Sequence, residues 1–512
     1  MTQLNSYKTS ASTSSKVMNK KKAIVIGSGF GGLSSAIRLQ ASGFDVQIFE
    51  KRDKPGGRAY VFEDKGFKFD AGPTVITAPH CIEDLFTLAQ KNMKDYVELL
   101  PITPFYRLLW QDGYSFDYNN DPAFLEKQIK DKSPSDWPGY LKFLQYSKEV
   151  FAEGYTKLVD KPFLTFSSMI KVAPQLIRLR ADRSVYATVA RFIKDENLRE
   201  VFSFHSLLVG GNPFVVSSIY TLIHYLERNW GVFFPRGGTG ALVQGLVRLF
   251  EDLGGKIHLN AEIEKLNTLG NKVQSIVANG KTYDCDLVVS NADVVHTYED
   301  LLKSHSRGQQ AANRLKSKEF SMSLFVMYFG TKKKYPGLAH HTILFGPRYK
   351  ELLEEIFDKG TLPNDFSLYL HVPTVTDPSL APDGHEGFYV LSPVGHLGKL
   401  KIDWDKESKI YADKIMTYLE KRLLPGLKEN LVTFRIFNPQ DFKTELNSHL
   451  GSAFSLEPRL TQSAFFRVHN RDDVVENLYF VGAGTHPGAG LPGVINSGKA
   501  TADLILKDYS SH

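Results

Sequence analysis

Cysteine is scarce in this chain, and its scarcity limits the chemistry that the chain can carry. Only Cys81 and Cys285 occur among 512 residues, and they form no CxxC motif. A disulfide framework or a cysteine-based zinc cluster is therefore excluded, and a reducing, cytosolic compartment is expected. The adjacent His340 and His341 have no further ligand at metal-binding spacing, so we predict no metal site.

The chain also lacks a long apolar run and a strong excess of one charge. No window reaches the roughly 18 consecutive apolar residues of a spanning helix, and residues 1–20, rich in Ser, Thr, Asn and Lys, do not resemble a signal peptide. The net charge is +6, from 62 Lys and Arg against 56 Asp and Glu, so nucleic acid is not an implied partner. We expect a globular protein of about two or three domains whose membrane contact, if any, is peripheral.

A glycine-rich turn follows the first predicted strand. Residues 23–26 are apolar, and residues 27–32 read Gly-Ser-Gly-Phe-Gly-Gly, the pattern G-x-G-x-x-G, before a predicted helix. These glycines permit a tight turn and let the backbone approach a pyrophosphate at the helix N-terminus. Glu50 ends the next predicted strand, where a carboxylate can bind ribose hydroxyls. The unit predicts a dinucleotide site, and the negative charge of Glu50 disfavours NADP.

Two further segments favour FAD over NAD. Residues 54–58, Lys-Pro-Gly-Gly-Arg, bring a second glycine pair and a cation close behind Glu50, which suits a second approach to a long dinucleotide. Residues 478–494 are predicted to form a strand, a glycine-rich loop and a helix start, whose amides can hydrogen-bond a ribityl chain and a flavin edge that gains charge on reduction. Each segment alone could be a loop or a helix cap. Together with the first turn they predict FAD.

The predicted cofactor-binding elements are spread along the chain. Glycine-rich sequence returns at residues 233–240, before a predicted helix over 241–253. We therefore expect an α/β fold with a discontinuous Rossmann-like FAD-binding domain and a mixed α+β substrate-binding domain that includes a helical, membrane-facing part. The predicted division is a disordered tail over 1–21, the FAD-binding domain over 22–75, 231–293 and 471–512, and the substrate-binding domain over 76–230 and 294–470, with its membrane-associating part near 160–200.

These motifs resemble those of the bacterial phytoene desaturases, within the amine oxidase and protoporphyrinogen oxidase group of flavoproteins. The resemblance lies in residues 27–58, 67–77, 202–214, 290–298 and 481–490, and it extends over about 22 to 507. It implies FAD as cofactor and phytoene as substrate, with successive desaturations towards lycopene. The implied cofactor-binding residues are Gly27, Gly29, Phe30, Gly31, Gly32, Glu50, Lys51, Gly57, Arg58, Gly72, Pro73, Thr74, Ile263, Gly482, Ala483, Gly484, Gly493 and Val494.

The chemistry of this substrate sets further expectations. Phytoene has no ionisable or hydrogen-bonding group, so its affinity must come from burial in a long apolar tunnel at about 25 cal/mol per Å². Loss of a proton from an allylic cation needs no strong base, so we predict neither a catalytic triad nor a carboxylate pair. Thr485 and His486 are the catalytic candidates; His486 could accept the proton or only hydrogen-bond the backbone. His205 and His224 are interpreted as core histidines. Oxygen and a quinone are both possible acceptors of electrons from the reduced flavin.

A substrate that dissolves only in lipid also requires a docking surface. Residues 163–180 place apolar side chains at helical spacing beside Lys171, Arg178 and Arg180, although ordinary core packing explains such a stripe equally well and Pro174 disfavours a regular helix. We expect a cytoplasmic protein that associates peripherally with the inner face of the cell membrane.

Three other functions are alternatives to the desaturation of phytoene. A desaturase or isomerase of another carotenoid, hydroxylated or thirty-carbon, stays open, as does a non-catalytic protein that binds FAD and carotenoid. An amine oxidase lacks support, because we identify neither an aromatic cage nor acidic residues that would guide an amine.

Overall fold

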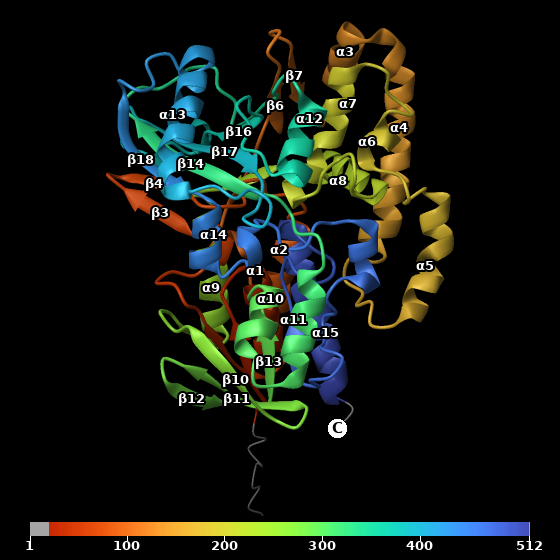
Figure 1. Ribbon diagram of the computed structural model, residues 1–512, viewed down its shortest axis with the longest axis vertical. Coiled ribbons are helices and arrows are strands. Elements are labelled where there is room, and N and C mark those ends of the chain that lie inside the picture. Colours follow the sequence, from red (N-terminus) through yellow and green to blue (C-terminus); the bar gives the residue numbers. More distant parts are fainter. Residues whose placement is uncertain (1–19, 511–512) are drawn as a thin grey trace, which may run out of the picture.

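The computed structural model describes residues 20–510, so most of the predicted tail lies outside the described residues. The lower lobe in Figure 1 is built on a five-stranded parallel sheet with the strand order β19-β13-β1-β2-β9. Its strands are β1 (Lys22–Ile26), β2 (Asp45–Phe49), β9 (Lys256–His258), β13 (Leu287–Ser290) and β19 (Leu478–Phe480). Segments from the beginning, the middle and the end of the chain therefore share one sheet.

Both faces of this sheet are covered, which explains why its strands are apolar throughout. Ala23 and Val25 of β1 pack towards helices on one face, whereas Ile24 and Ile26 pack towards a three-stranded antiparallel sheet and further helices on the other. The covering elements are α1 (Phe30–Ala41), α2 (His80–Leu88), α9 (Thr239–Asp252) and α15 (Leu491–Ser510) on the first face, and β10 (Ile263–Leu269), β11 (Lys272–Ala278), β12 (Lys281–Asp284), α10 (Val294–His296) and α11 (Ser306–Lys316) on the second.

The upper lobe contains a second, seven-stranded sheet in which only β15 and β6 pair in parallel. Its strand order is β18 (Leu431–Phe437), β14 (Ser323–Thr331), β17 (Glu386–Val394), β16 (Leu368–His371), β15 (His341–Leu344), β6 (Tyr106–Leu109) and β7 (Ser115–Tyr118). Phe325, Met327 and Phe329 of β14 pack with α13 (Trp404–Arg422), while Val326 and Tyr328 face the opposite core. The alternation is that of a strand buried on both sides.

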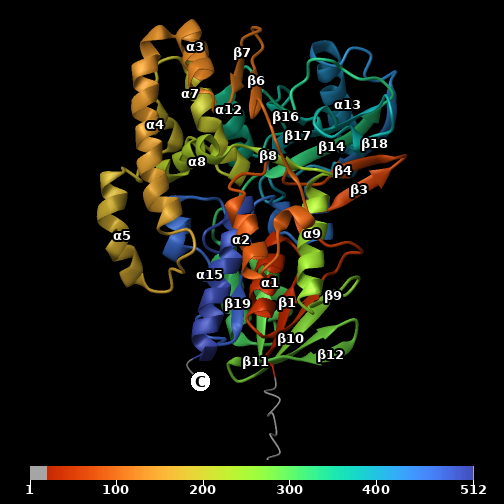
Figure 2. The same ribbon diagram turned by 180° about the vertical axis from the view of Figure 1, so that it is seen from behind.

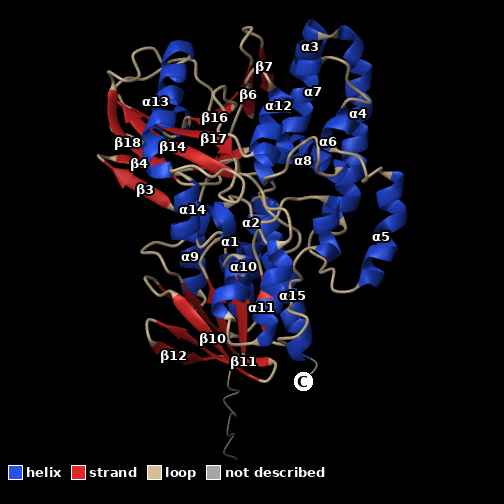
Figure 3. Ribbon diagram, in the orientation of Figure 1, coloured by secondary structure: helices blue, strands red, loops and turns tan. Residues whose placement is uncertain are grey.

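Helices complete the upper lobe, and Figure 3 shows all of those given next gathered beside its sheet except α14, which lies between the sheet and the lower lobe. They are α3 (Pro122–Lys132), α4 (Trp137–Phe151), α5 (Phe166–Arg178), α6 (Val185–Val189), α7 (Glu196–Ser203), α8 (Leu222–Trp230), α12 (Tyr349–Glu354) and α14 (Pro439–Leu446). Two short pairs, β3 (Val61–Asp64) with β4 (Phe67–Asp70) and β5 (Leu99–Pro101) with β8 (Phe233–Pro235), lie between the lobes.

The outermost helix of this group is α5, which lies on the flank of the molecule in both Figure 1 and Figure 2. None of its residues is buried. The helix begins at Phe166 after Thr165, and Pro174 lies within it without ending it. Over residues 20–510, no helix combines the length and the apolar character needed to cross a bilayer.

Candidate active site

The first glycine-rich turn leaves the start of α1 open. Gly27 has a φ of +85°, and the helix follows Gly29 with neither a side-chain cap nor an acidic residue in its first turn. A Cβ on Gly31 would lie 2.7 Å from Asn291 Oδ1 and 2.9 Å from the Gly482 backbone nitrogen. Glycine is therefore required, and the uncapped amides are available to an anion at the helix N-terminus.

Glu50 lies directly after β2, beside this turn. Its side chain is buried, and its Oε2 accepts hydrogen bonds from the Ser28 backbone nitrogen at 2.9 Å and from Ser28 Oγ at 2.7 Å. Its Oε1 accepts from the Arg52 backbone nitrogen at 3.0 Å. A carboxylate oxygen has two lone pairs, so the fixed group keeps acceptor capacity for hydroxyls of a ligand.

One cavity of about 790 Å³ joins nearly all the predicted site residues. The exceptions are Gly32, where a Cβ would meet the Gly27 carbonyl oxygen at 2.1 Å, and Thr485. The predicted residues that line the cavity are Gly27, Gly29, Phe30, Gly31, Glu50, Lys51, Gly57, Arg58, Gly72, Pro73, Thr74, Ile263, Gly482, Ala483, Gly484, His486, Gly493 and Val494. Segments separated by more than 400 positions in the sequence thus surround one space.

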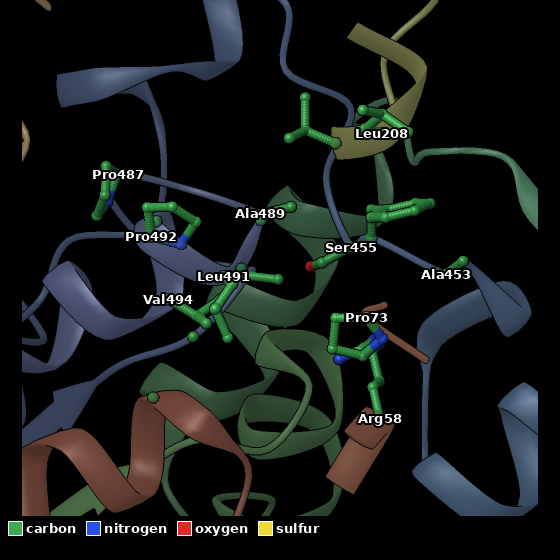
Figure 4. A pocket seen from close by; sticks show the side chains of 18 of the residues that line it. Arg58, Pro73, Leu208, Ala453, Ser455, Pro487, Ala489, Leu491, Pro492 and Val494 are labelled. Carbon is green, nitrogen blue, oxygen red and sulfur yellow. The ribbon is translucent and has the colours of Figure 1, made fainter. Parts of the chain in front are cut away.

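Arg58 supplies a cation within this cavity. Figure 4 shows it next to Pro73, across from Leu491 and Val494 of the closing segment. Its guanidinium donates to Ser448 Oγ at 3.4 Å, and its buried Nε has no hydrogen-bond partner within residues 20–510. Burial lowers the pKa of Arg58. A buried donor without a partner is expensive unless a ligand accepts from it.

Sequence reasoning missed two side chains of this region, Asn291 and Asp293. Both line the cavity directly after β13, and Oδ2 of Asp293 has no partner among the described residues. Their position in the sequence could have identified them, because polar residues at the carboxyl end of a strand in an open parallel sheet commonly face the ligand. Glycine turns, an acid, a cation and unpaired buried polar atoms together suit a long dinucleotide such as FAD.

The closing segment places its two catalytic candidates differently. Thr485 is fully buried away from the cavity, where its Oγ1 donates to the Val468 carbonyl oxygen at 2.5 Å. His486 lines the cavity, and its Nε2 donates to the Leu158 carbonyl oxygen at 3.1 Å, while Nδ1 has no partner in the described part of the chain. Burial lowers the pKa of His486 to about 4, so its imidazole is neutral at pH 7. The geometry leaves a chemical role open only to His486.

The other glycine-rich turn, at residues 233–240, is occupied by the protein itself. The buried Asp70 carboxylate accepts hydrogen bonds from the backbone nitrogens of Thr239 at 2.8 Å and Gly240 at 3.0 Å, at the start of α9. Residues 233–240 do not line the cavity. Burial raises the pKa of Asp70 to about 6, although both backbone donors oppose this shift.

Beyond the closing segment the cavity continues between apolar walls. The seven-stranded sheet contributes Leu324, Ile343 and Leu391, and α5 contributes Val172 and Leu176. Other apolar side chains along the same walls are Met169, Ile219, Leu222, Ile223, Leu226, Phe345 and Leu353. This part of the cavity suits a long hydrocarbon.

A buried carboxylate also lies among the apolar side chains of the cavity wall. Glu227 of α8 is buried, its Oε1 accepts from the Tyr106 hydroxyl at 2.7 Å, and its Oε2 lies 3.2 Å from His205 Nε2. His205 and His224 are both buried, as predicted. Glu227 could not be predicted from local sequence, because its pairing with Tyr106 depends on the fold.

Comparison with known proteins agrees with this architecture. The model of the flavin-containing amine oxidoreductase family matches residues 30–506. A lycopene-forming phytoene desaturase from Pantoea ananas is 60% identical over 95% of this chain and 99% of its own length, and a neurosporene-forming one from Rhodobacter capsulatus is 42% identical over 94% of each. The chain belongs to the bacterial phytoene desaturase family. The family identification and the flavin cofactor predicted from sequence are thereby confirmed.

Solved structures of other oxidoreductases share the fold at low sequence identity. An oxidoreductase from Methanosarcina mazei superposes with a TM-score of 0.62 at 17% identity, covering 94% of this chain and 100% of its own. Wild-type putrescine oxidase bound to putrescine gives 0.61 at 13% identity, covering 95% and 99%. The predicted α/β fold class is confirmed, whereas the domain boundaries and the roles of individual residues stay predictions.

Proposed function

We propose that this protein is a FAD-dependent phytoene desaturase that forms lycopene in carotenoid biosynthesis by successive removal of hydride and proton. The observation that carries the proposal is the single cavity, whose one part is lined by glycine turns, Glu50 and Arg58 and whose other part is apolar. Relatives that are 60% identical along nearly their whole length have this printed activity. The cavity thus offers adjoining space for a flavin and for a hydrocarbon.

The chain's own residues would hold the cofactor at defined points. The open N-terminus of α1 would bind the pyrophosphate, Glu50 would accept hydrogen bonds from ribose hydroxyls, and backbone amides near the start of α15 would hydrogen-bond the flavin. When bound, FAD supplies the acceptor for a hydride from the substrate. Arg58, with its unpaired Nε, offers a donor to an electron-rich group in the same space.

Apolar walls would position the substrate and exclude water. The seven-stranded sheet contributes Leu324, Ile343 and Leu391 to the lining of the cavity, and α8 contributes Leu222, Ile223 and Leu226. Each Å² of hydrocarbon buried there contributes about 25 cal/mol to binding. With a pKa of about 4, His486 is too weak a base to hold the released proton at pH 7, so we assign it the fixing of the closing segment through Leu158.

We propose in addition that α5 docks on the membrane and admits the substrate. Phe166, Ile170 and Ile177 expose 56%, 60% and 73% of their surface, while Val172 and Leu176 of the same helix line the cavity. The helix therefore connects an exposed apolar surface with the apolar space behind it. This arrangement supports peripheral association of a cytoplasmic protein with the inner face of the cell membrane.

The cationic contribution to docking is smaller than the sequence pattern indicated. Arg178 lies 3.2 Å from Glu149, and Arg180 lies 3.0 Å from Asp182. We therefore propose that apolar insertion of α5, aided by Lys171, provides most of the binding energy. Changing Phe166, Ile170 and Ile177 to Ser should reduce co-flotation with anionic liposomes at least about tenfold. The matched control changes the exposed Leu269, Ile410 and Phe434 to Ser and should float normally.

The activity is tested in cells that accumulate phytoene. Expression of the full chain should give the absorption spectrum of lycopene in a solvent extract, together with yellow, flavin-loaded protein after purification. Colourless phytoene alongside flavin-loaded protein would overturn the assignment. Chromatography of the extract distinguishes lycopene from the neurosporene and ζ-carotene named for the relatives at 42% and 34% identity.

Two further arms address the remaining alternatives. A non-catalytic carotenoid-binding protein would keep an oxidised flavin when it is mixed anaerobically with phytoene-loaded liposomes, whereas a desaturase would bleach it. Adding either oxygen or a membrane quinone to the bleached sample then shows which acceptor restores the flavin spectrum. We propose the quinone, because docking of α5 on a bilayer brings the flavin close to lipid-soluble acceptors.

A further inference from the structure

Three histidines lie together behind the wall of the cavity. His341 of β15 pairs directly with His371 of β16, and His340 precedes β15. All three are buried, and one ring nitrogen from each lies within 4.8 Å of the other two. Strand pairing supplies His371, the third residue whose absence from the local sequence led us to predict no metal.

Hydrogen bonds orient two of the three imidazole rings. Nδ1 of His340 lies 2.6 Å from Thr376 Oγ1, and Nδ1 of His341 lies 2.7 Å from the Tyr369 hydroxyl. When each Nδ1–H donates to its oxygen, each Nε2 presents a lone pair. Those Nε2 atoms and both ring nitrogens of His371 have no partner among residues 20–510. An outer oxygen that fixes the tautomer of a ligating histidine is the usual arrangement around protein-bound metal ions.

We propose that His340, His341 and His371 bind one divalent transition-metal ion through their imidazole nitrogens, with a water molecule in the fourth position. Imidazole ligands favour Zn²⁺ and related ions over Mg²⁺ and Ca²⁺, which prefer oxygen. Bonds of about 2.0–2.1 Å require the three rings to rotate slightly towards one another. Hydroxide in the fourth position would offset part of the ion's charge, which the neutral histidines do not.

The ion would also determine the direction of a hydrogen-bond chain that ends at the cavity. The Tyr369 hydroxyl lies 2.6 Å from Thr74 Oγ1, and both residues line the cavity. With His341 Nδ1–H fixed as a donor, Tyr369 must donate to Thr74, which keeps its own proton for a further bond. The histidines are in this sense positioning residues for the cavity wall.

Metal content of the full-length, flavin-loaded protein tests the site directly. After growth with added Zn²⁺ and dialysis, elemental analysis should find about one ion per chain. His340→Gln and His371→Gln should lose most of it, whereas His385→Gln, at a partly exposed histidine outside the cluster, should retain it. Wild-type protein that keeps its flavin but contains no stoichiometric transition metal points to a bridging water instead.

A titration of the wild type needs no variant and covers the case in which the histidine variants fail to fold. Co²⁺ added to chelator-treated protein should produce the intense visible bands of a tetrahedral complex on the long-wavelength side of the flavin absorption. Thr376→Val and Tyr369→Phe retain all three histidines and should weaken Co²⁺ binding about 10- to 100-fold. Absence of these bands at a stoichiometric excess of Co²⁺, or unchanged affinity in both variants, overturns the proposal.

Discussion

The starts of α1 and α9 have similar sequences but different surroundings. Both helices follow a short strand and a glycine-rich turn, and both have glycine at the second helical residue, Gly31 and Gly240. The amides of α1 lack a side-chain cap and face the cavity, whereas those of α9 are bound by the Asp70 carboxylate. A Cβ on Gly238 would lie 2.7 Å from Asp70 Oδ2, so the acid fills the space that a ligand anion would need.

This difference shows what a glycine-rich turn can and cannot indicate. Such a turn predicts that a helix N-terminus will bind an anion, because its amides and dipole favour negative charge. Whether that anion is a cofactor or a side chain depends on whether another part of the folded chain places a carboxylate against the amides. At α9 the hairpin of β3 and β4 places the Asp70 carboxylate on the amides. Beside α1 the Glu50 carboxylate instead accepts hydrogen bonds from Ser28 and Arg52.

The largest effects are expected from substitutions at Gly31 and Gly240, one of which should affect flavin binding and the other only stability. Gly31→Val places side-chain atoms against Asn291 and the Gly482 backbone, and should weaken flavin binding by about 3 kcal/mol, or roughly 100-fold. Gly240→Ala, whose Cβ would meet Val61 Cγ2 at 2.1 Å, should lower the melting temperature yet keep a full complement of flavin. Flavin absorbance per protein, with circular dichroism as the folding control, measures both. Loss of flavin in Gly240→Ala alone would invalidate the distinction.

The pH dependence of stability should reveal the buried anion at α9. Burial raises the pKa of Asp70 to about 6, so the folded protein holds this proton more tightly than the unfolded chain. The corresponding stability is present at about pH 4 and is lost as pH rises through about 6, a change of about 3 kcal/mol. Denaturant unfolding of the wild type and of Asp70→Asn should show their difference in unfolding free energy falling by that amount. A difference that does not vary with pH would contradict the assignment.

Glu50 should have a smaller effect, and one that is specific to the cofactor. Glu50→Gln keeps the shape of the side chain but removes the charge from its hydrogen bonds to hydroxyls, so flavin affinity should fall about tenfold. Fluorescence titration of the flavin-free protein with FAD provides the measurement. Glu63→Gln, at an exposed glutamate of β3, serves as control. Equal affinity for FAD in Glu50→Gln and wild type would remove Glu50 from the proposed site.

The smallest effect is expected at His486, in the glycine-rich segment that precedes α15. A neutral imidazole whose Nε2 donates to Leu158 can be replaced by Gln, so His486→Gln should retain flavin and keep the rate of lycopene formation within about threefold. The wild-type rate should also show no titration of this group between about pH 6 and 8. A loss of more than about tenfold with flavin retained would instead identify His486 as the proton acceptor.

Local signals in the sequence were sufficient for the elements that bind through their backbone. The turn at residues 27–32, the strand that ends before Glu50 and the closing segment all reach the same cavity. The predicted start of a helix was wrong where a residue distant in sequence caps it. The helix predicted over 241–253, α9, begins at Thr239, because Asp70 accepts hydrogen bonds from the amides of Thr239 and Gly240.

Features that depend on tertiary pairing were beyond local reasoning. His371 meets His340 and His341 only through the pairing of β15 and β16, and Glu227 meets Tyr106 only in the folded upper lobe. Thr485 and His486 are both predicted from their place in the closing loop, but the Thr485 hydroxyl donates to the Val468 carbonyl oxygen and does not reach the cavity. One of the two therefore lines the cavity while the other is buried behind it.

The strand order of the parallel sheet has a consequence for how the protein is made. The strand that pairs with one edge of β1 is β13, and about 260 residues separate Ile26 from Leu287; β19 joins β13 later still. At ribosomal speeds of about 5–20 residues per second, this edge of β1 waits on the order of 10 to 50 s for its partner strand. An unpaired apolar strand exposed for that time is a substrate for chaperones and a risk for aggregation. Flavin loading must then follow release of the finished chain, so a supply of cofactor late in expression should govern the yield of active protein.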